Sequence, residues 1–385
     1  MFSARLHWNM QANPLSRLLE EKRSARAEIL DVTESNPTRA QFSYPEPEIL
    51  AALSDARSIL YEPSPAGLLE ARQAIAGYHG GIDPNRIVVT ASTSEAYSLL
   101  FKLLADPGDE VLVPRPSYPL FEFLANLESV RVVQYPLVYH EGWALDFEAL
   151  REHAASRTRA VIVVNPNNPT GSFLKSEELN QLVAFCAERN LAILSDEVFS
   201  DYTLGEDSRR VCSLTGVREV LAFSLSGLSK VIGLPQMKLG WIVVSGPAGV
   251  RSAALERLEL IADTYLSVNT PVQWAAAKLL GLRDRIQKQI SDRVRDNLAF
   301  LRERIGTDSS WSVLDLEGGW YATVRAPKIR TEEEWALHLL RDKDVLVQPG
   351  FFFDFDTEAF LVVSLLTAPD IFREGLDGIR SLAAR

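Results

Sequence analysis

Short apolar segments alternate with longer amphipathic ones over the first two thirds of the chain. The apolar segments have the length of buried strands, and they are Arg86–Thr90, Glu110–Pro114, Arg131–Leu137, Val161–Asn165, Ala192–Asp196, Val220–Ser224 and Leu239–Ser245. Between them, helices are predicted at Ser94–Ala105, Tyr118–Leu127 and Ser176–Asn190, where apolar residues recur at helical spacing. Continuous apolar strands that alternate with amphipathic helices predict a mostly parallel sheet covered by helices on both faces.

Beyond Pro247 this alternation ends. A long helical stretch is predicted from Ala253 to about Leu280, followed by a charged helix from Arg283 to Glu303. The remaining sequence predicts strands and one more helix, at Trp311–Leu316, Trp320–Val324, Thr331–Lys343, Val345–Gln348 and Phe360–Leu365. We therefore expect an α/β protein with a large domain at residues 46–282. A smaller α+β domain would consist of the N-terminal arm, residues 1–45, and the C-terminal part, residues 283–385.

The composition is that of an ordinary globular protein of 385 residues, with 46% hydrophobic and 24% charged residues. A formal charge of −11 argues against a nucleic-acid partner. The two cysteines, Cys186 and Cys212, form no CxxC motif, and the five histidines are scattered, so we expect no metal site. Since we find no signal peptide and no apolar run of membrane length, we expect a cytoplasmic protein that does not bind membranes.

Three polar residues follow apolar strands closely, and ligands bind at that edge of an open α/β sheet. They are Asn168 in an Asn-Pro-Asn-Asn-Pro turn, Asp196 at the end of Ala192–Asp196, and Lys230 in a segment rich in small residues. Partial burial would lower the pKa of the Lys230 amine and make it a nucleophile toward carbonyl groups. Each residue also has a purely structural interpretation: a solvated lysine, a carboxylate that caps a turn, and an ordinary turn asparagine.

Together the three segments resemble the fold-type I pyridoxal-phosphate (PLP) enzymes, and specifically the class I/II aminotransferases, from about Leu30 to the C-terminus. The resemblance implies that PLP is bound by the large domain, as a Schiff base on Lys230. Lys230 would then act as the base that moves a proton between the substrate Cα and C4′ of the cofactor. Asp196 would pair with the pyridine nitrogen, and Asn168 would donate a hydrogen bond to the phenolic oxygen of the cofactor.

The segment from Thr90 to Ala96 lies between a predicted strand and a predicted helix, where free backbone N–H groups suit a dianion. In isolation it is an ordinary Ser/Thr helix cap. The resemblance makes Thr93 and Ser94 ligands of the cofactor phosphate, with Ser92 standing where the family usually has glycine.

Two tyrosines also match the family. The resemblance makes Tyr118 the ring that stacks on the pyridine, although packing in the core is the alternative. It makes Tyr61 a ligand to the phosphate in the neighbouring subunit, which implies a homodimer with shared active sites.

Three positions depart from the family pattern. Lys238 stands where the family has an arginine that binds the phosphate, and we keep it as a phosphate ligand although lysine lacks the planar fork of arginine. Phe199 replaces a tyrosine that donates to the cofactor, so the pKa of the imine should rise unless Tyr202 substitutes. Val362 replaces the arginine that holds the substrate α-carboxylate, and valine cannot bind a carboxylate.

The substrate side of the site is less defined. Ser35 and Asn36, in Ser35-Asn-Pro-Thr38, match the N-terminal loop that flanks the substrate, whereas composition alone indicates only a turn. Arg39, just after that loop, is our candidate for the missing carboxylate ligand. Aromatic residues at 320–321 and 351–353 suggest an apolar side-chain pocket or simply pack between the domains.

The leading hypothesis is a PLP-dependent aminotransferase that moves an amino group through a Schiff base on Lys230 from an amino donor, which the resemblance implies is an amino acid, to a 2-oxo acid. The alternative keeps the same three residues but ends in C–S β-elimination or another non-transaminating reaction, since fold and cofactor do not fix the outcome. A third hypothesis is a non-catalytic effector domain of a transcription regulator, which the negative charge and short N-terminal segment disfavour.

Overall fold

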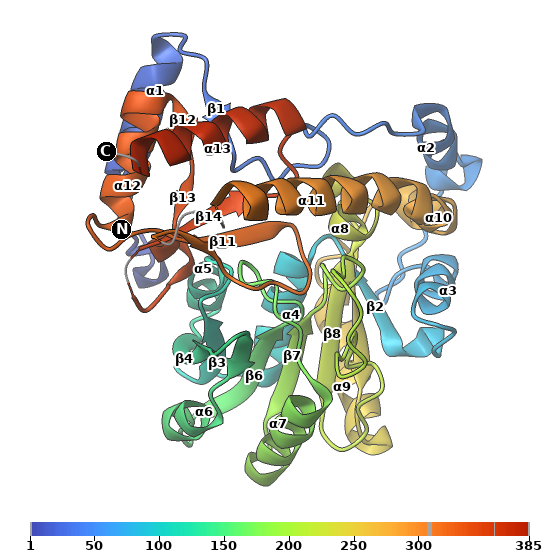
Figure 1. Ribbon diagram of the computed structural model, residues 1–385. Helices are drawn as coiled ribbons and strands as arrows, with labels where there is room; N and C mark the ends of the chain where they lie inside the picture. Colours follow the sequence, from blue (N-terminus) through green and yellow to red (C-terminus); the bar gives the residue numbers. More distant parts are fainter. Residues whose placement is uncertain (1, 306–309, 358, 384–385) are drawn as a thin grey trace.

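The computed structural model describes residues 2–305, 310–357 and 359–383, which form a large sheet and a small sheet with their helices. Figure 1 shows the large sheet below and the small sheet above it, with helix α11 running from α10 toward the small sheet. The large sheet has eight strands in the order β2-β9-β8-β7-β6-β3-β4-β5. Their bounds are β2 Ile87–Thr90, β3 Glu110–Arg115, β4 Arg131–Tyr139, β5 Trp143–Leu145, β6 Thr158–Val164, β7 Ala192–Asp196, β8 Ala222–Gly227 and β9 Gly240–Ser245.

The pairing of these strands is mostly parallel, as predicted. Strand β3 pairs in parallel with β4 and β6, and the parallel series continues from β6 to β7 and β8. Strand β9 runs antiparallel between β8 and β2, and β5 is an antiparallel edge strand. The carboxyl ends of the parallel strands therefore meet at one edge of the sheet, where ligands bind in open α/β sheets.

Helices cover both faces of the large sheet because its strands are apolar on both sides. One face packs on α4 (Thr93–Leu104), α5 (Phe121–Leu127) and α9 (Ala248–Asp263), with Val111 and Val113 of β3 pointing to that side. The other face packs on α6 (Phe147–His153) and α7 (Ser176–Arg189). Beside β2, the remaining helices of this region are α2 (Glu46–Leu53), α3 (Leu69–Tyr78) and α10 (Thr270–Gly281).

The small sheet is antiparallel, in the order β10-β11-β14-β13, with bounds Ser312–Val313, Tyr321–Arg325, Phe360–Ser364 and Gln348–Pro349. Its helices are α11 (Arg283–Ile305), α12 (Glu332–Lys343) and α13 (Pro369–Ala383). From the N-terminal arm come α1 (Pro14–Ser24), which packs on α12, and β1 (Leu30–Asp31), which pairs in parallel with β12 (Val345–Leu346). This arrangement confirms the predicted fold class: a large, mostly parallel α/β sheet and a separate smaller α+β unit. The boundaries at residues 45/46 and 282/283 stay a proposal.

Three local predictions were wrong. The stretch predicted as one helix from Ala253 to Leu280 is two helices, because Leu266 has φ 45° and Asn269 caps the start of α10 with its side chain. The strand predicted at Val345–Gln348 is divided, with β12 pairing with β1 and β13 with β14. The predicted strand Val220–Ser224 is shifted to Ala222–Gly227, and Lys230 lies on the short helix that follows it.

Within the described residues, no helix combines the length and the apolar character that crossing a membrane requires.

Candidate active site

A cavity of about 320 Å³ lies where the strands of the large sheet end, next to the small sheet. Val164 and Asp196, the last residues of β6 and β7, are partners in the register of these strands. Gly227 ends β8 and pairs with Gly240 at the start of β9. Tyr321, the first residue of β11, borders the cavity from the small sheet. Seven of the eleven site residues predicted from the sequence line this cavity, namely Ser35, Thr93, Ser94, Tyr118, Asn168, Asp196 and Lys230.

Lys230 stands on α8 (Leu228–Val231), directly after β8. Its backbone carbonyl accepts a hydrogen bond of 2.6 Å from the Tyr202 hydroxyl, which fixes the helix turn that carries the side chain. The Nζ atom lies 4.8 Å from the centre of the Trp320 ring and 5.4 Å from that of Phe199. Removal from water lowers the pKa of Lys230 to about 8, and the attraction of Asp196 opposes this shift. The amine is therefore partly neutral near neutral pH, as a nucleophile must be.

Asp196 is 7% exposed and is held by two hydrogen bonds. Its Oδ1 accepts from the backbone N–H of Val198 at 3.2 Å, and its Oδ2 accepts from the Tyr97 hydroxyl at 3.3 Å. Burial raises the pKa of Asp196 to about 6, while both hydrogen bonds and Lys230 act in the opposite direction. Tyr97 was not identified from the sequence, although it lies four residues after Thr93 and so on the same side of α4.

The start of α4 also borders the cavity, and it is suited to an anion. Ser92 caps the helix, with its Oγ accepting from the Glu95 N–H at 3.2 Å. Because an α-helix leaves its first amides without intrahelical partners, those of Thr93 and Ser94 are available to a ligand. Ser92 has φ −170°, an extended conformation that any residue adopts, so this turn needs no glycine. Gly240 packs closely against this turn, since a Cβ there would lie 3.1 Å from the Ser92 carbonyl carbon.

Asn168 and Tyr118 border the same cavity. Asn168 is 8% exposed, and its Oδ1 has no hydrogen-bond partner among the described residues. A buried polar atom without a partner in the protein is expected to be completed by a ligand. Burial raises the pKa of Tyr118 to about 12, so its ring carries a neutral hydroxyl at physiological pH. Ser229, next to Lys230, also lines the cavity and was not singled out from the sequence.

Four predicted site residues lie outside the residues that line this cavity. Lys238 is exposed, in the left-handed conformation at φ 52°, between the lining residues Pro235 and Leu239. Arg39 is exposed, and the Asn36 side chain accepts from the N–H and hydroxyl of Thr38 within its own turn. The structure therefore does not bring Arg39, Asn36 or Lys238 to the cavity, and their roles stay predictions.

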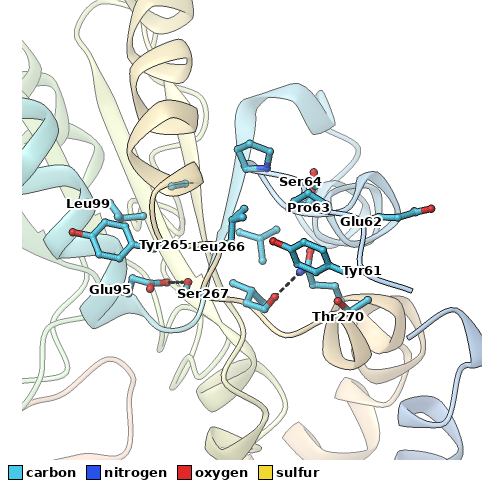
Figure 2. A pocket seen from close by; sticks show the side chains of 16 residues that line it. Tyr61, Glu62, Pro63, Ser64, Glu95, Leu99, Tyr265, Leu266, Ser267 and Thr270 are labelled. Atoms are coloured by element: carbon cyan, nitrogen blue, oxygen red, sulfur yellow. Dashed lines mark hydrogen bonds between the residues drawn. The ribbon is translucent and has the colours of Figure 1, made fainter. Parts of the chain in front are cut away.

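Tyr61 is the fourth of these residues, and it is 77% exposed. It lines a second, smaller pocket together with Glu95, Tyr265 and Ser267, and Figure 2 shows Tyr61 and Tyr265 on opposite sides of it. The Ser267 hydroxyl donates to Glu95 Oε2 at 2.7 Å, which links this pocket to helix α4. Tyr61 is thus accessible to solvent at the edge of this pocket, and its predicted role stays a prediction.

The departures at Phe199 and Val362 can now be located. Phe199 lines the cavity and its ring faces the Lys230 amine. Tyr202 does not substitute for the missing hydroxyl, because its own hydroxyl is bonded to the Lys230 carbonyl and it is not among the lining residues. Val362 is fully buried in β14 of the small sheet. Strand β14 pairs with β11, the strand that begins at Tyr321.

The described residues contain no group of three or more His, Cys, Asp or Glu side chains that could hold a metal ion.

A family model described as aminotransferase class I and II matches residues 27–372. The chain belongs to this family. An alanine aminotransferase of Mycobacterium tuberculosis is 29% identical over 363 residues, covering 89% of this chain and 82% of that protein. A glutamate-pyruvate aminotransferase of Haemophilus influenzae is 27% identical over 350 residues, with 88% and 86% covered. Among solved structures, an alanine aminotransferase from Pyrococcus furiosus is 26% identical and superimposes with a TM-score of 0.90 over 100% of both chains.

The protein is accordingly a PLP-dependent aminotransferase, as the leading hypothesis stated. The C–S lyase alternative is not favoured, and membership of a transferase family disfavours the non-catalytic effector domain. The cavity of this aminotransferase fits PLP in three ways. It offers a partly neutral amine at Lys230, a buried carboxylate at Asp196, and helix amides with hydroxyl groups at Thr93 and Ser94 for a phosphate. The unpartnered Asn168 side chain adds a polar contact for a ring substituent.

The lowered pKa of Lys230 yields a test by pH. Because only the neutral amine attacks a carbonyl, the rate at which the cofactor-free aminotransferase takes up PLP should rise with pH and reach half of its maximum near pH 8. A lysine with an ordinary pKa would reach that point only at about pH 10. Stopped-flow absorbance of the bound cofactor measures the rate, and Lys230→Ala is the control. A rate that is flat between pH 6 and 9 would contradict the assignment.

Proposed function

We propose that Lys230 and Asp196 are the catalytic residues of this aminotransferase and that the cavity around them is its PLP site. The observation that supports this most is a partly neutral lysine and a buried aspartate in the same cavity at the ends of neighbouring strands. Perturbed pKa values that arise from burial and a specific charge partner are typical of catalytic groups.

Bound PLP supplies an electron-withdrawing ring for the carbon that carries the transferred amino group. Asp196 would keep the ring nitrogen protonated, and Tyr97 would keep Asp196 ionised by donating to Oδ2. Lys230 Nζ would remove a proton from the substrate Cα and return it on the cofactor side. Thr93 and Ser94 would hold the phosphate, and Tyr118 and Asn168 would hold the ring. The substrates would be an amino donor and a 2-oxo acid.

We further propose that the aminotransferase is a homodimer in which Tyr61 reaches the phosphate of the partner's cofactor. Ile59, Leu60 and Tyr61 are consecutive and are 87%, 61% and 77% exposed, which is costly for a chain on its own. Tyr265, which borders the pocket of Figure 2 with Tyr61, is also exposed. We also propose a cytoplasmic location, since Cys186 and Cys212 are both free thiols.

The first experiment locates the cofactor. Purified protein should be yellow, and reduction with borohydride should fix the pyridoxyl group on the peptide that contains Lys230, identified by mass spectrometry. Lys230→Ala should lose both the absorbance and the turnover. Label on a different lysine would overturn the proposal.

The second experiment concerns Asp196. The Asp196→Asn protein should still bind PLP, but kcat and kcat/KM should fall together by at least ~100-fold, about 2.7 kcal/mol in the barrier, because the ring nitrogen loses its ionic partner. Glu197→Gln is a matched control, since Glu197 is the adjacent buried carboxylate but bonds to Ser224 and the Leu214 N–H. Turnover of Asp196→Asn within about threefold of wild type, under ~1 kcal/mol, would show that the role is wrong.

The third experiment tests the shared site with hybrid dimers. Tyr61→Phe should weaken PLP binding about tenfold, because one hydrogen bond to a charged group is lost. If Tyr61 acts across the interface, a hybrid of one Tyr61→Phe and one Lys230→Ala subunit contains one complete site and should bind one PLP per dimer with wild-type affinity. Weak binding by the hybrid would place Tyr61 in its own subunit's site, and a monomer in light scattering would contradict the dimer itself.

A further inference from the structure

The helix turn that carries Lys230 depends on donors from other segments. Helix α8 has only four residues, and an α-helix leaves the carbonyl groups of its last turn without intrahelical partners. Val231, which ends the helix, is 1% exposed, and Gly233 just after it is also buried. Buried carbonyl groups are paired in folded proteins, so these two require donors from elsewhere in the chain.

Two side chains from the side of the small sheet supply these donors. The Nε2 atom of Gln287, on α11, donates to the Val231 carbonyl at 2.8 Å. Figure 1 shows α11 passing beside α8. The Tyr44 hydroxyl, from the N-terminal arm, donates to the Gly233 carbonyl at 2.7 Å. The segment that begins at Lys230 is therefore held from outside the large sheet.

The Gln287 side chain is itself fixed in orientation. Its Nε2 atom also donates to Asp201 Oδ2 at 2.6 Å, so both amide hydrogens are used. The same carboxylate oxygen accepts from the Tyr78 hydroxyl at 3.1 Å. Asp201 directly precedes Tyr202, whose hydroxyl is bonded to the Lys230 carbonyl. Two consecutive residues thus hold α8 directly and orient the side chain that holds it from α11.

Tyr44 is placed equally closely. Burial raises the pKa of Tyr44 to about 12, so its hydroxyl keeps the proton that it donates. Gly233 has φ 60°, and a Cβ there would lie 2.9 Å from the Tyr44 hydroxyl oxygen and 3.3 Å from Pro37 Cβ. The N-terminal arm therefore packs directly on the segment that follows Lys230.

Helix α11 and the N-terminal arm are also bonded to each other. Gln289 Nε2 donates to the Ser43 carbonyl at 2.9 Å, and Gln289 Oε1 accepts from the Ser43 N–H at 2.9 Å. Further along the helix, the Arg293 guanidinium donates to the Ala40 carbonyl at 3.2 Å. The arm thus has more than one attachment to α11.

We infer that Gln287 and Tyr44 are positioning residues for Lys230, and that they hold the turn on which its amine faces the cavity. Neither residue lines the cavity, so both act through the backbone of α8 and not by contact with cofactor or substrate. The inference rests on the proposed role of Lys230. When either donor is removed, its carbonyl regains a partner only by turning toward another donor or toward water, and that movement displaces Lys230.

Uptake of PLP by the cofactor-free protein, followed by stopped-flow absorbance, tests this positioning. Gln287→Met keeps the length and helix propensity of the side chain but removes both donors. Its maximal rate of uptake should fall at least ~10-fold, because attack on a carbonyl depends on the orientation of the amine. The pH of half-maximal uptake should rise from about 8 by at least ~0.5, since a displaced amine is more hydrated. Tyr44→Phe should lower the rate about 3- to 10-fold, as expected for one lost hydrogen bond.

Gln289→Met is the matched control. Gln289 lies on the same helix and also bonds to another segment, but its partners are Ser43 and the Arg285 carbonyl and not α8. Its rate and its midpoint should stay at the wild-type values. If circular dichroism shows that Gln287→Met does not fold, Tyr44→Phe decides.

Several outcomes would overturn the inference. A wild-type rate in Tyr44→Phe, an unmoved midpoint in folded Gln287→Met, or equal losses in Gln289→Met would each show that these bonds do not position the amine. Failure of the proposed function would look different: the wild-type protein would take up no PLP, or Lys230→Ala would take it up at the wild-type rate.

Discussion

The removal of Lys230 and Asp196 from water within one cavity is the constraint on which the site depends. Burial penalises both charges, so the pKa of the lysine falls to about 8 and that of the aspartate rises to about 6. Their mutual attraction and the two hydrogen bonds on Asp196 limit these shifts. The pKa values of both groups therefore lie near neutral pH, where each group can gain or lose a proton. The burial that causes this is unfavourable for folding but useful for chemistry.

The fold supplies this environment through strand ends and one helix start. Parallel strands β6, β7 and β8 deliver a turn, a carboxylate and a lysine to the same edge, and helix α4 directs its first amides to it. Tyr202 and Tyr97, from outside the sequence motifs, then fix the Lys230 backbone and the Asp196 carboxylate. The aromatic rings of Phe199 and Trp320 lie beside the amine. Phe199 makes this part of the cavity less polar than a tyrosine at the same position would.

The substrate side is where this aminotransferase differs from its family pattern. A buried valine occupies the position of the usual carboxylate ligand, and the paired neighbours on both sides of it are neutral polar residues. The exposed Arg39 lies away from the lining of the cavity.

The sequence by itself determined the alternation of strands and helices and the fold class, and it predicted the residues of the cofactor end, because apolar runs and short motifs are local signals. Asn168, Asp196 and Lys230 could be identified since each lies at the end of a buried strand or a few residues after it. Local signals could not predict that Val345–Gln348 contributes to two sheets, because strand pairing involves distant partners. They also could not predict that the helical stretch is interrupted before Asn269, because capping involves specific partners. Only the tertiary structure decided that Tyr97 holds Asp196 and that Tyr202 is engaged by the Lys230 carbonyl. Each of these contacts joins segments that are separated in the chain, and only the packing of helices and loops against the sheet brings them together.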